Sequence, residues 1–299
     1  MTRRGSYYLS RVIKAGQLNQ DSLIEAISHP ATIFVGKYAW TITDSVKYEA
    51  EGKILYIFGK LSKYSPEGTV KVVRQNLEMP VIEPNLIEAS SPFVYIPEFS
   101  GIAYLHVWNE IERDVFASRF SRIIEESFNS FFVECKIEPI TNLEKFLQKL
   151  QTLESFIEIS AKVNPPNPLF GDAWRSLREY LTKRQIGELR IKERAGETGS
   201  IQSDVSKHIN GILSQTDDRP YKPEKPIDIT DAGILMAADG YGDGKIVGHE
   251  KITGRMVILK VSEKHTSFLF ETEPEPDALF QEAYRQFQNI SNERNMDHA

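Results

Sequence analysis

The first hundred residues contain short runs in which apolar and polar side chains alternate, the pattern of strands in a half-buried sheet. Gly, Asp, Ser and Pro residues, which favour turns, separate these runs. The pattern predicts a strand over 7–13, a short helix over 21–28, and further strands over 32–35, 38–42, 53–61, 69–73, 93–96 and 102–107. We therefore expect an antiparallel, β-rich N-terminal part.

The next sixty residues change between helical and strand patterns. A stripe of apolar residues at helical spacing predicts a helix over 113–128 that packs against a sheet. Alternation predicts strands over 131–137 and 157–163. Between these strands, Thr141 and Glu144 fit a capping box at the start of another helix. The order of elements predicts a β-α-β segment.

Three prolines then mark a change in the direction of the chain. Pro165, Pro166 and Pro168 fix their own φ angles and disfavour helix in the residues before them. We expect a domain boundary here, between a β-rich α+β domain (1–163) and a mixed α/β domain (164–299).

The second part begins with a predicted basic helix over 173–184. Its apolar residues share one arc, so Arg175 and Lys183 are expected to point away from the core, with Arg178 near the edge of the arc. The residues on that arc are Trp174, Leu177, Tyr180 and Leu181.

Later patterns complete the predicted fold. They predict a helix over 201–213, strands over 234–237, 245–249 and 256–261, and a terminal amphipathic helix over 276–290. The fold class is therefore predicted to be α+β, with a mixed C-terminal part that ends in a helix.

Composition indicates a folded protein, since 40% of the 299 residues are apolar and 26% are charged. The single cysteine, Cys135, excludes an intrachain disulfide and a cysteine-cluster metal site. Because the N-terminus lacks an apolar signal segment and no run approaches about 18 apolar residues, we expect a cytoplasmic protein without a membrane span of its own.

The distribution of charge is uneven around a net charge of −6. Residues 173–194 carry seven basic and three acidic side chains, whereas residues 266–299 are acidic. The basic residues are Arg175, Arg178, Lys183, Arg184, Arg190, Lys192 and Arg194. Arg3 and Arg4 add positive charge at the N-terminus. Such a patch can attract a polyanion despite the net charge, although a solvated helix face beside a polar strand would have the same composition.

The segment from Asp239 to Glu250 resembles an EF-hand calcium loop, with matches at its first, fifth, sixth, eighth and twelfth positions. Tyr241 at the third position cannot supply the expected carboxylate or amide oxygen. A strand pattern follows where an EF-hand would have its second helix. A glycine-rich hairpin turn is therefore favoured over a cation site, which stays open as an alternative.

Glu134 and Lys136 on a predicted strand resemble half of a restriction-type nuclease motif, with Asp114 as a conceivable metal ligand. The six histidines lack metal-ligand spacing, and the chain has neither a P-loop nor a nucleophile elbow. We therefore expect no catalytic residue, no metal and no cofactor.

Three segments together resemble a known family. Residues 132–140, 156–163 and 170–172, followed by the basic helix, are similar in order and spacing to the RexA-like family of phage exclusion (abortive infection) proteins. The resemblance implies a cytosolic, homodimeric, sequence-nonspecific DNA-binding sensor of an antiviral defence system. It also implies a membrane-associated effector as partner and no catalytic site.

The leading hypothesis is a non-catalytic sensor that contacts the DNA backbone through the seven basic residues of 173–194, assisted by Arg3 and Arg4. No helix shows the Arg, Asn and Gln grouping of a major-groove reader, so contacts to phosphates are favoured. Two alternatives stay open. One is a metal-dependent defence nuclease that uses Asp114, Glu134 and Lys136, and the other is an adaptor that binds an acidic protein partner without nucleic acid.

Overall fold

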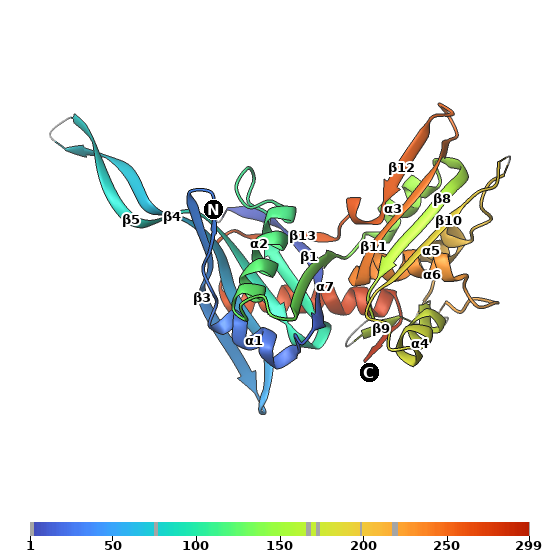
Figure 1. The fold of residues 1–299 in the computed structure, drawn as a ribbon, viewed down its shortest axis with the longest axis horizontal. Helices are drawn as coiled ribbons and strands as arrows, with labels where there is room; N and C mark the ends of the chain where they lie inside the picture. The colour runs from blue at the N-terminus through green and yellow to red at the C-terminus, as the bar shows by residue number, and fades with distance from the viewer. Residues whose placement is uncertain are drawn as a thin grey trace.

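The computed structural model describes residues 3–74, 77–165, 169–171, 174–197, 199–216 and 221–298. Within these residues, the N-terminal strand runs pair into an antiparallel sheet of eight strands (Figure 1). Its strands are β1 (Arg4–Gly16), β2 (Ile33–Val35), β3 (Tyr38–Ala50), β4 (Lys53–Arg74), β5 (Leu77–Ile96), β6 (Gly101–Leu105), β7 (Val133–Pro139) and β13 (Ser267–Glu271). The order is β13-β1-β6-β5-β4-β3-β2, with β7 beside the second half of β1. The chain thus returns, near its end, to pair with its first strand.

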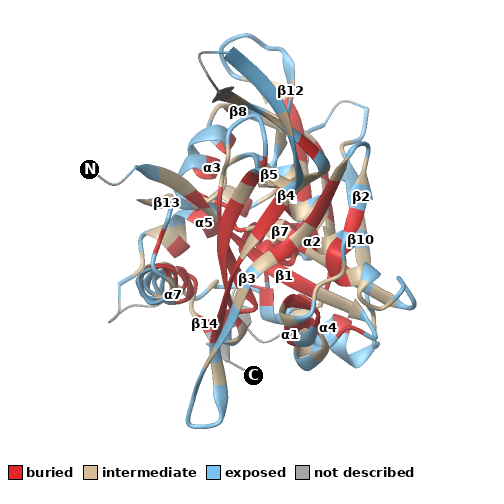
Figure 2. Cartoon of the chain, turned by 90° about the vertical axis from the view of Figure 1, so that its left-hand side faces the viewer, coloured by how far each residue is buried: buried red, intermediate tan, exposed pale blue. Residues whose placement is uncertain are grey.

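Helices cover both faces of this first sheet because its central strands are apolar at successive positions. On β5, Phe93 and Tyr95 pack in the cluster that contains α1 (Gln20–Ser28) and α2 (Arg113–Glu126). Val94 and Ile96 point the other way, into the cluster that contains α7 (Pro276–Glu293). Figure 2 shows the buried residues along the middle of the sheet and the exposed ones along its hairpins.

The close contact of α7 with the sheet depends on a glycine at the start of β6. A Cβ atom at Gly101 would lie 2.6 Å from the ring of Phe287 on α7. The same ring stacks on Phe99, with the ring centroids 5.5 Å apart, in the short helical turn η1 (Pro97–Phe99). The terminal helix is therefore fixed against the first sheet.

The outer halves of β4 and β5 form an arm that extends away from the rest of the molecule (Figure 1). Beyond Tyr64, β4 pairs with β5 alone, as far as the pair Arg74 and Leu77. Proline has no backbone N–H to donate to a neighbouring strand. Because each strand of the arm has only one neighbour, its prolines can sit where the missing N–H would face solvent. The turn signals at 65–68 accordingly do not end the strand, and the separate strands predicted over 53–61 and 69–73 are one.

A second sheet, with the order β10-β8-β11-β12, has helices on one face only in the described part of the chain (Figure 1). Its strands are β8 (Leu153–Val163), β10 (Leu189–Arg194), β11 (Gly242–Glu250) and β12 (Met256–Lys260). The packed helices are α3 (Leu143–Leu150), α5 (Val205–Leu213) and α6 (Ile229–Met236). α4 (Arg175–Lys183) lies near the end of the sheet where β10 begins, and β9 (Leu169–Gly171) pairs with β14 (Met296–His298).

One apolar cluster joins the two parts of the molecule, since it contains residues of both sheets together with α7. The expected boundary after residue 163 does not coincide with the division between the sheets. β8 lies in the second sheet although it precedes the boundary, and β13 lies in the first sheet although it follows it.

The α+β class, the antiparallel N-terminal sheet and the terminal helix are confirmed. The helix predicted over 113–128 is confirmed as α2. The strand predicted over 234–237 is wrong, because these residues continue α6 and the turn that follows it. Residues 230–241 are buried throughout, and a wholly buried helix has no polar face to reveal its period.

The capping box predicted at Thr141 is also wrong, by one residue. The side chain of Asn142 accepts the N-terminal hydrogen bond of α3, from the backbone N–H of Lys145 at 2.9 Å. The hydroxyl of Thr141 instead donates to the carbonyl of Val261, in the turn η4 (Val261–Glu263).

Candidate nucleic-acid interface

The basic helix is held by its apolar arc, as the sequence predicts. Leu177 and Leu181 of α4 and the adjacent Trp174 are buried, and Trp174 is only 1% exposed. Their burial turns the opposite face of the helix outward. Arg175, Lys183 and Arg184 are exposed, and Arg178 is half-buried. Tyr180 differs from its predicted burial, since it is exposed and lies beside the guanidinium of Arg184.

The basic strand β10 forms one edge of the second sheet. Alternation turns Leu189 and Ile191 toward the helices and leaves Arg190, Lys192 and Arg194 on the open face. The predicted basic helix and basic strand are thus both found, connected by residues 184–188.

Strand pairing adds lysines that the sequence reading missed. Lys192 lies opposite Ser160 of β8, which lies opposite Lys245 of β11, which lies opposite Lys260 of β12. These residues form one row across the sheet, and Arg190 and Lys162 begin the neighbouring row. We call this surface the basic sheet face and define it by Lys162, Arg190, Lys192, Arg194, Lys245 and Lys260.

Two carboxylates organise these basic side chains. Glu158 on β8 contacts Lys192 at 3.1 Å, Arg194 at 2.7 Å and Lys245 at 3.1 Å. The hydrogen bonds from Arg194, Lys192 and Lys245 lower the pKa of Glu158 to about 2, so it is ionised at neutral pH. Glu158, on β8, therefore holds three cations of the two neighbouring strands, two from β10 and one from β11.

Glu188 plays a similar part at the approach to β10. It contacts Lys162 at 2.8 Å and Arg190 at 3.0 Å, and it also reaches Lys136 of β7 at 3.6 Å. The hydrogen bonds from Lys162 and Arg190 lower the pKa of Glu188 to about 2. The carboxylate thus links the basic sheet face to the first sheet.

Positive charge remains in excess after these ion pairs. Among the described residues, the six basic side chains of the face are accompanied by Glu158 and Asp243 on the same face and by Glu188 beside it. An ammonium has three N–H donors and a guanidinium has five, so one ion pair leaves donors for a further anion. The face can therefore hold phosphate groups.

The remaining exposed side chains of this face are aliphatic. Met256 and Ile258 of β12 are 67% and 55% exposed. No Phe, Tyr or Trp side chain joins them among the strand residues that the register places on this face. Stacking of unpaired bases needs aromatic side chains, so the face favours phosphate contacts over base contacts.

The two N-terminal arginines do not join this surface. Arg4 pairs with Glu271 of β13 at the edge of the first sheet, and its guanidinium donates to the carbonyl of Leu269 at 2.8 Å. The backbone carbonyl of Arg3 accepts from the backbone N–H of Thr272, so Arg3 lies at the same edge of the first sheet. β13, beside which β1 begins, lies apart from β10 in Figure 1.

The residues of the nuclease alternative are held in separate contacts. Glu134 contacts Lys136 at 2.8 Å, whereas Asp114 on the first turn of α2 contacts Arg113 at 2.7 Å. In the part of the chain that the structure describes, no group of three His, Cys, Asp or Glu side chains could hold a metal ion. This geometry gives the nuclease alternative no support.

The EF-hand interpretation is wrong, because Asp239 belongs to a buried network. One carboxylate oxygen accepts from Arg294 at 2.5 Å and the other accepts from the indole of Trp174 at 2.6 Å. Gly240, with φ of +86°, breaks the helical conformation inside the turn η3 (Ala237–Tyr241), and β11 begins at Gly242. The favoured hairpin turn is also wrong, since the segment connects a helical turn to a strand.

Arg11 of β1 completes this network without exposure to solvent. Its guanidinium donates to the carbonyl of Phe99 at 2.5 Å and to that of Asp239 at 3.4 Å. It also approaches the rings of Tyr241 and Phe287. Burial lowers the pKa of Arg11. The network thus joins the first sheet to the terminal helix and the basic helix.

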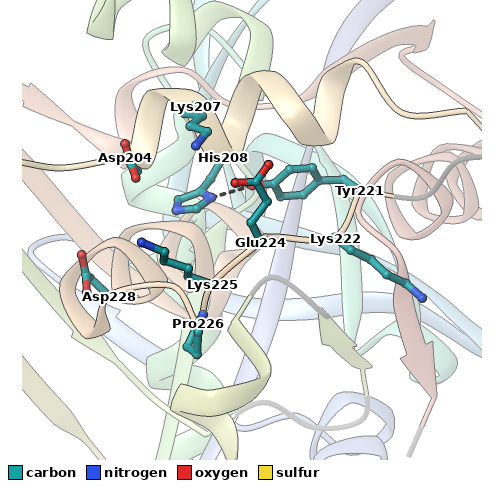
Figure 3. Close-up of a pocket in the computed structure, with 9 residues that line it drawn as sticks. All are labelled: Asp204, Lys207, His208, Tyr221, Lys222, Glu224, Lys225, Pro226 and Asp228. Carbon is teal, nitrogen blue, oxygen red and sulfur yellow. Dashed lines mark hydrogen bonds between the residues drawn. The ribbon is translucent and has the colours of Figure 1, made fainter.

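A pocket of about 320 Å³ lies beside α5, on the helical side of the second sheet (Figure 3). The ring nitrogen Nδ1 of His208 and the hydroxyl of Tyr221 are 2.6 Å apart, and burial lowers the pKa of His208. Its charged residues balance, since Lys207, Lys222 and Lys225 face Asp204, Glu224 and Asp228. Neither serine nor cysteine lines this pocket among the described residues, and the hydroxyl of Tyr221 is the group that the histidine contacts.

Comparison with known protein families identifies a match. Residues 21–217 match a family described as a domain of unknown function, DUF4747. This segment includes α4, β8 and β10 but not the lysines of β11 and β12. No curated protein matches the chain. Among the described helices, none is long and apolar enough to cross a membrane.

Proposed function

The chain belongs to the DUF4747 family, whose function is unknown, and we propose that it binds the backbone of duplex DNA through the basic sheet face, with α4 as an adjoining contact. The observation that carries the proposal is the row of Lys192, Ser160, Lys245 and Lys260 across four strands of a face without helices.

The location of the positive charge on one face supports this proposal more than the total charge of the chain does. The chain as a whole carries −6, so the rest of its surface repels a polyanion. The basic sheet face and its neighbour α4 are therefore the surfaces that we expect to approach phosphates. Such binding orients the duplex on this face and depends steeply on salt.

Phosphate contacts give affinity without reading of sequence. The exposed face of α4 presents arginine and lysine together with Glu179, and it lacks the Asn and Gln side chains that recognise adenine. The absence of Phe, Tyr and Trp side chains from the described sheet face disfavours a single-strand platform. A duplex bound without sequence preference is therefore the ligand that these residues support best.

The role in phage exclusion is a wider proposal that depends on the RexA-like resemblance. It includes a cytoplasmic homodimer that signals to a membrane-associated effector. Light scattering of the purified chain tests the dimer. Deletion of the gene tests the role in defence and should abolish phage resistance. The wild-type gene should restore resistance, whereas a gene for a chain altered on the basic sheet face should not.

The direct test of DNA binding is fluorescence anisotropy with duplexes of unrelated sequence at several salt concentrations. The logarithm of affinity should fall linearly with the logarithm of salt, by about 0.9 for each phosphate contacted. The double variant Lys192→Glu and Lys245→Glu should lose affinity for every duplex alike. A matched double variant, Lys37→Glu and Lys53→Glu on the first sheet, should retain it.

Three results would count against the proposal. Affinity that does not change with salt excludes phosphate contacts, and equal affinity of the two double variants places the contact elsewhere. Cleavage of the duplex with Mg²⁺ that EDTA abolishes favours the nuclease alternative. Absence of DNA binding, with the same face required for binding an acidic protein, favours the adaptor.

A further inference from the structure

The arm, which consists of residues 65–74 of β4 and 77–87 of β5, exposes large apolar side chains to solvent. Ile82 is 71% exposed, Leu77 is 66% exposed and Ile87 is 58% exposed. A two-stranded ribbon by itself is at best marginally stable in water, and apolar groups exposed together mark a surface for association. The arm is therefore a surface that a partner is expected to cover.

One side of the arm is apolar across both strands. The register places Val70 opposite Val81 and Val72 opposite Met79, and opposite residues of an antiparallel pair project to the same side. We call these four residues the apolar strip. Glu83, two residues after Val81, projects to that side as well. The apolar strip is thus bordered by a carboxylate.

The charge of the arm indicates a positive partner surface. Residues 65–88 contain four glutamates against one lysine and one arginine. Glu67, Glu83 and Glu88 are exposed, whereas Glu78 contacts Lys71 at 3.2 Å. Because a ribbon is only one layer thick, carboxylates on either side of it lie within about one screening length, roughly 8–10 Å, of a covering surface. The partner surface should therefore be basic as well as partly apolar.

The basic sheet face has both properties. Its six basic side chains exceed the carboxylates beside them, and Met256 and Ile258 expose aliphatic groups at its β12 side. In the described part of the chain no helix lies over this face. The arm and the basic sheet face are therefore complementary in charge and in apolar content.

An arm cannot reach the basic sheet face of its own chain. Figure 1 shows the arm and the second sheet at opposite ends of the longest dimension of the molecule. Two copies that lie antiparallel about a twofold axis bring each arm to the second sheet of the other copy. A twofold arrangement of this kind closes as a dimer.

The area of the contact favours this reciprocal arrangement over a pairing of the two arms. At about 3.3 Å per residue and about 4.8 Å per strand, one side of the arm covers roughly 330 Å². Two arms packed on each other would bury about 660 Å², less than the ~1,200 Å² of a stable interface. Two arms that each pack on the other copy's sheet would bury about 1,300 Å². The reciprocal contact reaches the size of a stable dimer.

We propose that a second copy of this chain covers the basic sheet face, with each arm laid across that face of the other copy in a closed dimer. The apolar strip packs on Met256 and Ile258, and the glutamates of the arm pair with Lys192 and Lys245. Because this face is also the DNA surface proposed above, arm and duplex compete for it. The competition rests on that proposed function, whereas the dimer does not.

Sedimentation velocity of the full chain between about 1 and 100 μM tests the dimer. The wild type should show a reversible monomer–dimer equilibrium. The arm variant, Glu67→Lys with Glu83→Lys, and the face variant, Lys192→Glu with Lys245→Glu, should each raise the dissociation constant at least about tenfold. An equimolar mixture of the two variants should form a heterodimer, because opposite charges then meet in both contacts.

The matched control is Glu49→Lys with Glu51→Lys, at exposed positions beside the turn between β3 and β4, and it should dimerise as the wild type does. Circular dichroism establishes that each variant is folded. A wild type that stays monomeric at about 100 μM would overturn the proposal. So would arm and face variants that dimerise normally, a mixture of them that stays monomeric, or species that grow beyond a dimer with concentration.

A duplex added at low salt tests the competition and should convert the wild-type dimer into DNA-bound monomers. Above the dimer dissociation constant, the arm variant should bind the duplex at least about threefold tighter than the control variant, which carries the same added charge. Equal affinity of these two variants would overturn the competition and leave the dimer standing. Absence of duplex binding by the wild type and both variants would overturn the proposed function and with it the competition, while the mixing experiment still decides the dimer.

Discussion

Trp174 donates its indole N–H to a carboxylate oxygen of Asp239 at 2.6 Å, and both residues are buried. The bond connects the start of the basic helix to the turn before β11. Asp239 in turn holds Arg294 at the end of α7. The orientation of α4, near the end of the second sheet, is thereby coupled to the centre of the molecule.

Trp174→Ala should lower the free energy of unfolding by about 3–5 kcal/mol, because it removes a large buried side chain. Trp174→Phe retains most of the packing and leaves one Asp239 oxygen unpaired, so it should cost about 1–3 kcal/mol. Urea denaturation measures both. A Trp174→Ala variant that melts as the wild type does would contradict the burial of this side chain.

Glu158→Gln should strengthen DNA binding while it weakens the fold. The change removes the negative charge that holds three cations, so the basic sheet face gains about one net positive charge and the salt slope steepens by up to about 0.9. The melting temperature should fall. Glu154→Gln, exposed on the same strand, should change neither property. Unchanged affinity in Glu158→Gln would place the DNA contact elsewhere.

Stability should fall in acid between about pH 4.5 and pH 2. The pKa values of Glu158 and Glu188 are lowered to about 2 by their basic neighbours, from 4.5. Within that range the unfolded chain binds protons that the folded chain does not, so unfolding is favoured as the pH falls. The double variant Glu158→Gln and Glu188→Gln should show a shallower decline in urea denaturation. An identical decline would show that these ion pairs contribute no stability.

Glu138 should have the opposite effect. Its pKa is raised from 4.5 to about 7, chiefly by burial, so the folded chain keeps a proton that the unfolded chain has released. Its contribution to stability is complete below about pH 4.5 and is lost as the pH rises through about 7. Glu138→Gln should therefore flatten the pH dependence of the unfolding free energy across this range. A wild type with no such dependence would contradict the raised pKa.

The local pattern of apolar and polar residues was sufficient to predict a helix or strand where one face of that element meets solvent. α2 and α4 each have a polar face, and both were predictable from their apolar stripes. α6 has almost none, so its apolar run was read as a strand. Asp239 was misread for a related reason, because its partners Trp174 and Arg294 are distant in sequence.

The candidate site was only half predictable. Residues 189–194 reveal their charge in one short run, whereas Lys162, Lys245 and Lys260 stand alone among apolar or glycine neighbours. Sheet pairing collects them into one surface. In the sequence, each of these lysines occupies an outward-facing position of an alternating strand. That pattern could have identified them, but only the order of the strands shows that they share one surface.

The return of the chain to β1 has a consequence for synthesis on the ribosome. Arg11 emerges early, yet its bonding partners Asp239 and Met296 follow 228 and 285 residues later. Until they arrive, this guanidinium has no buried site to enter and β1 lacks β13 along one edge. Contacts so distant in sequence slow folding. The first sheet therefore has to remain incomplete, and open to chaperones, until the last helix has left the ribosomal tunnel.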